Sequence, residues 1–332
     1  MKKYNFKDMP LEIYGVPFWK QTGQLRRLPD SVIDKVPRLE FLGKRCPGAR
    51  VCFRTDAEEF TVRITFETLT FDVGMSIYAC QSAAVLIGER ENAHFAGLVN
   101  PPDYNTFTFE KTIHKEKGME DVTIFLPRNE IIANVEIIVP KEAKVESPTP
   151  YRALKPILYY GSSITEGGCC CSVFNAYNAI LSNRLNVDYF NFGFSGSAKG
   201  ELEIADYINT IDMSLFVYDY DHNASTAEDL RKTHEPFFKR IREKNPNLPV
   251  IMLSKPAARY TENDKIRRRI ILQTYINAIN EGDANVYFVD GEMLFGNRDR
   301  EICTIDMKHP NDIGFLRMAD TLEPLIRKIL LV

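Results

Sequence analysis

From residue 157 onward, short apolar runs alternate with longer helical patterns, and this alternation constrains the fold more than any other feature of the chain. Five runs have the length and apolar character of buried strands: residues 157–160, 188–194, 215–220, 250–253 and 286–289. Helical patterns follow at residues 175–185, 226–243 and 313–330. Strands that alternate with helices form parallel sheets with helices on both faces. The second half is therefore predicted to be a three-layer α/β/α domain.

The first half of the chain shows strand patterns and no clear helix. Residues 59–66 alternate apolar and polar side chains with a period of two, which gives a strand one apolar face. Five further runs resemble strands: residues 51–54, 75–80, 105–110, 122–126 and 135–139. Short, closely spaced strands predict a β-sandwich or jelly roll. The run Leu25-Arg26-Arg27-Leu28-Pro29 is expected to be a surface loop or edge.

Residues 147–150, Ser-Pro-Thr-Pro, form the best boundary between these two patterns. Two prolines with serine and threonine make a stiff, polar link. The chain is therefore divided into a β-sandwich domain at 1–148 and an α/β domain at 149–332. A length of 332 residues suits two domains.

Charge and apolar patterning exclude several classes of function. The net charge of −3 argues against a general nucleic-acid binder, which needs a basic surface. The longest apolar run, residues 78–88, is far too short to span a membrane. The basic start at Met1–Lys3 has no apolar segment behind it, so we expect no signal peptide and a cytoplasmic location. The oligomeric state is left open.

The chain has seven cysteines, of which Cys169, Cys170 and Cys171 are consecutive. Neighbouring cysteines rarely meet disulfide geometry, and no C-x-x-C pair indicates zinc. We expect no metal and no cofactor, and thiols that are buried or half-buried. The alternative is a reactive thiol at Cys169–Cys171, because a helix N-terminus lowers a thiol pKa.

The stretch Gly161-Ser162-Ser163-Ile164-Thr165 lies between a predicted strand and a predicted helix. In an open α/β sheet such turns lie at the carboxyl ends of the strands, where ligands bind. The stretch resembles the first sequence block of the SGNH (GDSL-type) hydrolases, roughly G-D-S-I-T, whose serine is the nucleophile. The resemblance places the nucleophile at Ser163, with Ser162 replacing the family's usual aspartate.

Two further loops resemble the second and third blocks of that family. Phe192-Gly193-Phe194-Ser195-Gly196 follows a predicted strand, and the family's oxyanion-hole glycine falls on Gly196. It could equally be an ordinary turn. The third block is usually G-x-N-D, and only its asparagine is kept here, as Asn223. Asn223 could instead cap the following helix, for which Ser225 to Glu228 fit a capping box. The neighbouring His222 could line the pocket or lie on the surface.

The most specific match is Asp306-Met307-Lys308-His309-Pro310, a D-x-x-H-P pattern before a helix, which resembles the family's fifth block. An aspartate and a histidine three residues apart on one loop can face each other. The carboxylate then accepts from imidazole Nδ1–H, which leaves Nε2 to accept the serine proton. No G-x-S-x-G pattern is present, which disfavours the α/β-hydrolase fold.

The resemblance implies a three-layer, flavodoxin-like SGNH hydrolase domain after a jelly-roll domain, as in some bacterial carbohydrate esterases. The catalytic residues would be Ser163, Asp306 and His309. The oxyanion donors would be the N–H groups of Ser163 and Gly196 and the Asn223 amide. Possible pocket-lining residues are Ser162, Glu166 and His222.

The reaction implied is hydrolysis of a small acyl ester through an acyl-enzyme, with an O-acetylated carbohydrate as the leading substrate. Two alternatives stay open. One is a lipid or thioester acylhydrolase that uses the same residues. The other is a non-catalytic protein that binds a carbohydrate, or a phosphate at the helix N-terminus after Gly161.

Overall fold

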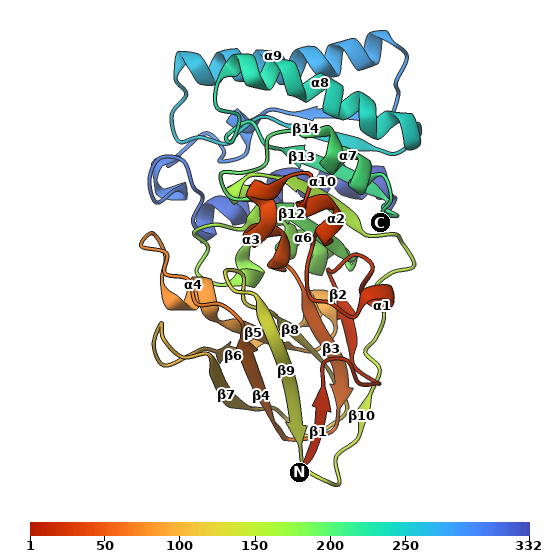
Figure 1. Ribbon diagram of the computed structural model, residues 1–332, viewed down its shortest axis with the longest axis vertical. Helices are drawn as coiled ribbons and strands as arrows, with labels where there is room; N and C mark the ends of the chain where they lie inside the picture. Colours follow the sequence, from red (N-terminus) through yellow and green to blue (C-terminus); the bar gives the residue numbers. More distant parts are fainter.

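The computed structural model describes residues 1–332 and contains two antiparallel sheets and one parallel sheet. Figure 1 shows the antiparallel strands in its lower half and the parallel sheet with the long helices in its upper half. None of the helices combines the length and apolar character needed to cross a membrane.

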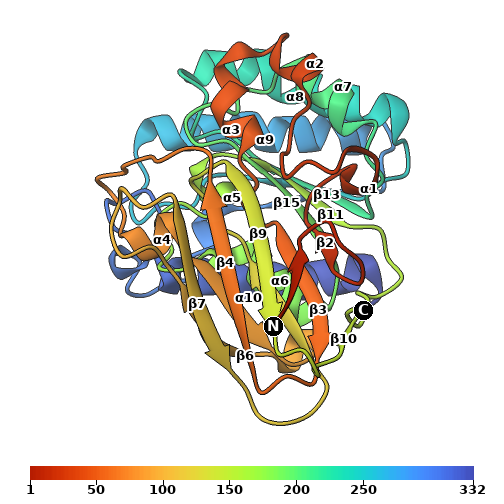
Figure 2. The same cartoon turned by 60° about the horizontal axis from the view of Figure 1, so that its bottom comes forward.

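The antiparallel sheets face each other across a shared apolar core and form a β-sandwich, as predicted. One sheet has the order β1-β9-β4-β7, and the other has β10-β3-β8-β5-β6 with β2 paired to β3. Figure 2 shows β4, β7 and β9 of the first sheet running alongside one another. The strands are β1 (Lys2–Asn5), β2 (Glu12–Tyr14), β3 (Arg50–Thr55), β4 (Glu59–Phe66), β5 (Ala83–Ile87), β6 (His94–Val99), β7 (Thr108–His114), β8 (Glu120–Phe125), β9 (Ile132–Val139) and β10 (Val145–Glu146).

The strand predicted at residues 75–80 is wrong, because the chain forms helix α4 (Ile77–Gln81) there. The Ser76 side chain accepts a hydrogen bond from the Ala79 N–H at 3.3 Å and caps this helix. Strands β5 and β6 have no counterpart among the predicted strands. All residues of β5 are buried, so the strand lacks the alternation that marks a half-exposed one.

The second half contains the predicted parallel sheet, with strand order β12-β11-β13-β14-β15. This is the flavodoxin-like doubly wound order, in which ligands bind where the strand order reverses, at the carboxyl end of the first strand. That strand is β11. The five strands are β11 (Ile157–Gly161), β12 (Tyr189–Gly193), β13 (Leu215–Asp219), β14 (Val250–Leu253) and β15 (Val286–Val289).

Helices cover both faces of the parallel sheet. One face packs against α7 (Leu202–Ile208), α8 (Ala227–Lys244) and α9 (Glu262–Asn280). The other packs against α6 (Tyr177–Leu185) and α10 (Asp312–Leu330). The short helices are α1 (Trp19–Thr22), α2 (Asp30–Ile33), η1 (Pro37–Leu39), α3 (Glu40–Lys44), η2 (Arg90–Asn92), α5 (Ser163–Glu166), η3 (Val173–Asn175), η4 (Gly291–Met293) and η5 (Glu301–Cys303).

The segment that precedes and includes α2 and α3 packs into the core of the α/β half. Leu28, Val32 and Leu39 are buried in one apolar cluster with residues of β11, β12, α7 and α8. Figures 1 and 2 both place α2 and α3 beside that half. The expectation of a surface loop at residues 25–29 is wrong, since Arg27 is only 1% exposed and Leu28 is fully buried. The proposed division between residues 148 and 149 therefore separates two sequence patterns. Side chains from before this division nevertheless pack into the core of the half that follows it.

Candidate active site

Ser163 is the first residue of α5 and lies just beyond the carboxyl end of β11. The Ser162 side chain is buried and accepts from the Ile164 N–H at 3.2 Å, so it caps this short helix. A Cβ at Gly161 would overlap the Thr165 side chain and the Asp219 carbonyl. Glycine at this position lets β11 and β13 approach closely just before Ser163.

The loop before α10 brings His309 and Asp306 to Ser163. His309 Nε2 lies 3.0 Å from Ser163 Oγ, and His309 Nδ1 lies 2.7 Å from Asp306 Oδ2. A backbone bridge between Thr304 and Pro310 closes the loop. The three residues predicted to be catalytic thus form one chain of hydrogen bonds, with the imidazole between the hydroxyl and the carboxylate.

Asp306 is held as an anion in this arrangement. Partial burial opposes its ionisation, but the His309 N–H, the imidazole and the Lys308 N–H outweigh that effect and lower the pKa of Asp306. The two backbone N–H groups donate to Asp306 Oδ1 at 2.7 Å and 3.0 Å. The other oxygen is then free to accept from imidazole Nδ1.

The backbone N–H groups of Ser163 and Gly196, the two expected oxyanion donors, donate to no other group of the chain. Gly196 has a φ of +68°, a left-handed conformation that favours glycine. Its loop is tied to β11, because Phe194 N–H donates to the Gly161 carbonyl at 2.8 Å. The arrangement fits an oxyanion hole, which requires donors that are fixed in place and unpaired.

Asn223 is attached to the same loop. Its amide nitrogen Nδ2 donates to the Phe194 carbonyl at 2.9 Å. The alternative that Asn223 caps α8 is wrong, because the N-cap is Thr226, whose side chain forms the capping box with Asp229. The capping box predicted from Ser225 to Glu228 is therefore misplaced by one residue.

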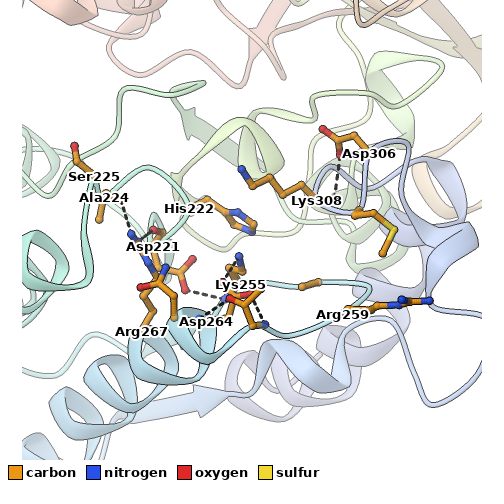
Figure 3. Close-up of a pocket in the computed structure, with 14 residues that line it drawn as sticks. Asp221, His222, Ala224, Ser225, Lys255, Arg259, Asp264, Arg267, Asp306 and Lys308 are labelled. Carbon is orange, nitrogen blue, oxygen red and sulfur yellow. Dashed lines mark hydrogen bonds and ion pairs between the residues drawn. The ribbon is translucent and has the colours of Figure 1, made fainter.

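A cavity of about 670 Å³ opens beside the Asp306–Lys308 loop (Figure 3). Its other walls come from residues 221–225 after β13 and from residues 255–267 after β14, and only 3 of its 14 lining residues are hydrophobic. Of the three proposed pocket residues, His222 lines this cavity, whereas Ser162 and Glu166 are buried on either side of Ser163 in the chain.

Several charged groups of the cavity were not found by sequence reasoning. Lys255 Nζ pairs with Asp264 Oδ1 at 2.5 Å, and Figure 3 shows both on the cavity wall. Burial raises the pKa of Asp221 to about 6. Burial, followed by the charge of Lys255, lowers the pKa of His222 well below its usual range, and His222 Nε2 has no hydrogen-bond partner. His222 was among the expected pocket residues, but no spacing pattern in the sequence marks Asp221, Lys255 and Asp264, which follow two different strands.

The cysteines are all free thiols, and their surroundings argue against the reactive-thiol alternative. Burial raises the pKa of Cys169 to about 11 and that of Cys170 to about 12. A hydrogen bond with Asp312, followed by burial, raises the pKa of Cys171 to about 11. No group of three or more His, Cys, Asp or Glu side chains is arranged to hold a metal ion.

Two family models match the chain, one in each half. Residues 154–327 match the model of the GDSL-like lipase/acylhydrolase family. Residues 1–145 match the GxDLY model, described as the N-terminus of SGNH-hydrolase-type esterases. No curated protein sequence matches the chain.

Solved structures share the whole arrangement at low sequence identity. A protein from Bacteroides ovatus described as a GDSL-like lipase is 24% identical, with a TM-score of 0.89 over 99% of this chain and 98% of that one. The salicylyl-acyltransferase SsfX3 from a tetracycline biosynthetic pathway is 18% identical, with a TM-score of 0.80 over 100% and 98%. A family two carbohydrate esterase from Clostridium thermocellum is 16% identical, with a TM-score of 0.63 over 86% and 93%. At these identities the likeness concerns the fold.

Proposed function

The chain belongs to the GDSL-like lipase/acylhydrolase family and is a carboxylic ester hydrolase, and we propose that Ser163, His309 and Asp306 are its catalytic residues. The observation that carries this proposal is the hydrogen-bonded chain from Ser163 Oγ through the His309 imidazole to Asp306. In this series of hydrogen bonds, the Ser163 hydroxyl, the His309 imidazole and the Asp306 carboxylate have the mutual geometry that acyl transfer requires.

In the proposed reaction, Ser163 Oγ attacks the ester carbonyl carbon while its proton moves to His309 Nε2. Asp306 stabilises the imidazolium that forms. The oxygen of the tetrahedral intermediate accepts from the N–H groups of Ser163 and Gly196 and from the Asn223 amide. When the intermediate collapses, the alcohol leaves with the proton from Nε2, and the acyl group stays on Ser163. A water molecule then attacks the acyl-enzyme in the same way, with His309 Nε2 accepting its proton. The carboxylic acid is released and the proton returns to Ser163 Oγ.

The polar cavity is lined by Asp306 and not by Ser163 or His309, so it lies beside the reacting groups, where it supports a hydroxyl-rich alcohol as the leaving group. Its walls offer carboxylates, lysine, serine and threonine, which bind hydroxyl groups, and few apolar side chains. We therefore propose a small acyl ester, such as acetate, on a carbohydrate. The family two carbohydrate esterase with the same fold was solved in complex with cellohexaose, which is consistent with this class. The scarcity of apolar lining disfavours the lipid alternative, because a long acyl chain needs an apolar channel.

Labelling with a fluorophosphonate tests the nucleophile. We expect one labelled residue, Ser163, and loss of labelling and aryl-acetate hydrolysis in Ser163→Ala. The matched control is Ser162→Ala, which removes a buried cap and should still be labelled. Hydrolysis that persists in Ser163→Ala but is lost in Ser162→Ala would shift the nucleophile by one residue.

A chain-length series of aryl esters tests the acyl group. We expect kcat/KM to be highest for acetate and to fall as the chain lengthens. Release of acetate from an acetylated oligosaccharide, but not from an acetylated lipid alcohol, would support the carbohydrate class. A rate that rises with chain length would favour the lipid alternative.

A further inference from the structure

Arg27, from the amino-terminal half, inserts its guanidinium beneath the loop that carries Gly196. It donates to the carbonyls of Asn191 (3.0 Å) and Gly193, the residues where β12 passes into that loop. Its carbon Cζ lies 4.4 Å from the centroid of the Phe194 ring. The remaining donors bind the carbonyls of Leu42 (2.6 Å) and Arg45 (3.0 Å) within its own half. Arg27 thus joins the 27–45 segment to the end of β12.

Glu166 holds the same loop through Ser195. It is the last residue of α5, three residues after Ser163. Its Oε2 accepts from the Ser195 N–H at 2.9 Å and from the Ser195 hydroxyl. Its Oε1 has no hydrogen-bond partner and lies 3.9 Å from Arg27 Nη2, with both side chains 1% exposed. The Glu166 carboxylate therefore links three parts of the site: α5, which begins with Ser163; Ser195, the residue before Gly196; and Arg27.

Charge makes the two residues depend on each other. A buried carboxylate is strongly unfavourable unless a cation lies nearby, and removing one partner of a buried pair leaves the other uncompensated. Arg45 and Arg128 also act on the Glu166 charge, but Arg27 is the residue paired with it directly. Burial lowers the pKa of Arg27 to about 10 and Glu166 opposes this shift, so the guanidinium is still a cation at neutral pH.

We propose that Arg27 and Glu166 are positioning residues that fix the Gly196 N–H beside Ser163 for the esterase reaction. The inference rests on the proposed function. An oxyanion donor is effective only at about 2.7–3.1 Å from the developing charge, so a small movement of the loop weakens it. The bond strengthens as charge develops, so its loss lowers kcat more than it raises KM. The amino-terminal half is thereby a structural part of the reaction centre.

A second ion pair between the two halves, with a buried arginine, provides a control. Arg50 is fully buried, pairs with Asp188, whose side chain is 14% exposed, and lies 4.4 Å from the Tyr189 ring, so like Arg27 it is a buried arginine beside a carboxylate and an aromatic ring. Asp188 precedes the first residue of β12, however, whereas Arg27 binds at the carboxyl end of that strand. The two arginines thus contact opposite ends of one strand, and only the Arg27–Glu166 pair includes a residue of α5, the helix that begins with Ser163.

The test compares Glu166→Gln, Arg27→Lys and Ser195→Ala with Asp188→Asn in the full chain, using kcat, KM and the urea midpoint. We expect Glu166→Gln and Arg27→Lys to lower kcat by about tenfold or more with KM changed less than threefold. Ser195→Ala, which keeps its backbone N–H bond to Glu166, should lower kcat several-fold. The rate at which the fluorophosphonate labels Ser163 should fall together with kcat, because the transition state of the labelling reaction uses the same oxyanion donors. Asp188→Asn should shift the midpoint and leave kcat and labelling unchanged.

The proposal is overturned if Glu166→Gln and Ser195→Ala keep the wild-type kcat, whatever their stability, because the pair would then only join the two halves. It is also overturned if Asp188→Asn lowers kcat as much as they do. If Arg27→Lys does not fold, these two variants decide, since both leave Arg27 in place. Failure of the proposed function looks different, because wild-type protein would then show neither labelling of Ser163 nor ester hydrolysis.

Discussion

The amide nitrogen of Asn223 lies 2.9 Å from the carbonyl oxygen of Phe194 and donates a hydrogen bond to it. This bond uses one of the two N–H groups of the amide and fixes the side chain on the loop that carries Gly196. The second N–H is left to act as a donor. This bond to the loop of Gly196 supports the proposal that Asn223 is an oxyanion donor, although the family's usual neighbouring residues are absent.

We expect Asn223→Ala to lower kcat by about 10²–10³ and to change KM little, because the lost bond strengthens as charge moves onto the oxygen. Steady-state kinetics and a urea melt on the same variant measure both effects. Thr226→Ala is the control, since it removes the true cap of α8 and should lose about 1 kcal/mol of stability with kcat intact. A normal kcat in Asn223→Ala would reduce the oxyanion hole to two backbone donors.

Asp306→Asn tests the orienting carboxylate. The change keeps the shape of the side chain but removes the acceptor that faces imidazole Nδ1–H, so we expect kcat to fall on the order of 10³–10⁴. The side chain is partly exposed, so the urea midpoint should change little. Asp312→Asn removes an equal charge from the start of α10, where Asp312 accepts from the Cys171 N–H, and should keep kcat within a few-fold. Comparable losses in both variants would point to a general charge effect.

Gly193, at the end of β12, and Gly196, in the loop that follows, should differ sharply in their tolerance of a side chain. A Cβ at Gly193 would overlap backbone atoms of Glu166, which cannot rotate away, so we expect Gly193→Ala to lose about 3 kcal/mol or more. A Cβ at Gly196 meets nothing within 4 Å, and only its φ of +68° is unfavourable. Gly196→Ala should therefore cost about 1–2 kcal/mol. Urea unfolding of both variants measures this, and equal losses would contradict the close packing of β12 on α5.

His234 should make the fold sensitive to acid. It is buried against Tyr218, its Nδ1 lies 2.9 Å from Thr274 Oγ1, and burial lowers its pKa to about 3. The unfolded chain binds this proton below about pH 6.5, whereas the folded chain binds it only below about pH 3, so stability falls as the pH drops between these values. From pH 7 to pH 5 this contribution is about 2 kcal/mol.

His234→Phe keeps a ring beside Tyr218 and removes the titration. Urea unfolding at pH 7 and pH 5 should show that the wild type loses about 2 kcal/mol more than the variant over this range. The comparison cancels other titrating groups, including Asp221, whose raised pKa acts in the opposite direction. If the wild type and His234→Phe lose the same stability between pH 7 and pH 5, the proton is taken up by a group other than His234.

The sequence alone determined the parallel sheet and the grouping of the proposed catalytic residues. Four of the five strands are buried throughout and β15 is half-buried; each appears as an apolar run, so all five were predicted. Ser163 and His309 come from loops at the carboxyl ends of parallel strands, which meet at one edge of the sheet, and a motif that follows this rule can be located without coordinates. Asp306 is found because its partner is only three residues away.

Tertiary structure alone decided the placement of Arg27 and the contact between the two halves. The partners of Arg27 are mainly backbone carbonyls, which every residue carries, so no sequence pattern distinguishes a buried arginine from one in a surface loop. Helix α4 was missed for a related reason. A six-residue segment has too few apolar positions to distinguish the period of 3.6 residues of a helix from the period of two of a strand. Local patterns specify elements and short-range pairs, whereas a side chain whose partners lie more than a hundred residues away is placed only when the layers pack together.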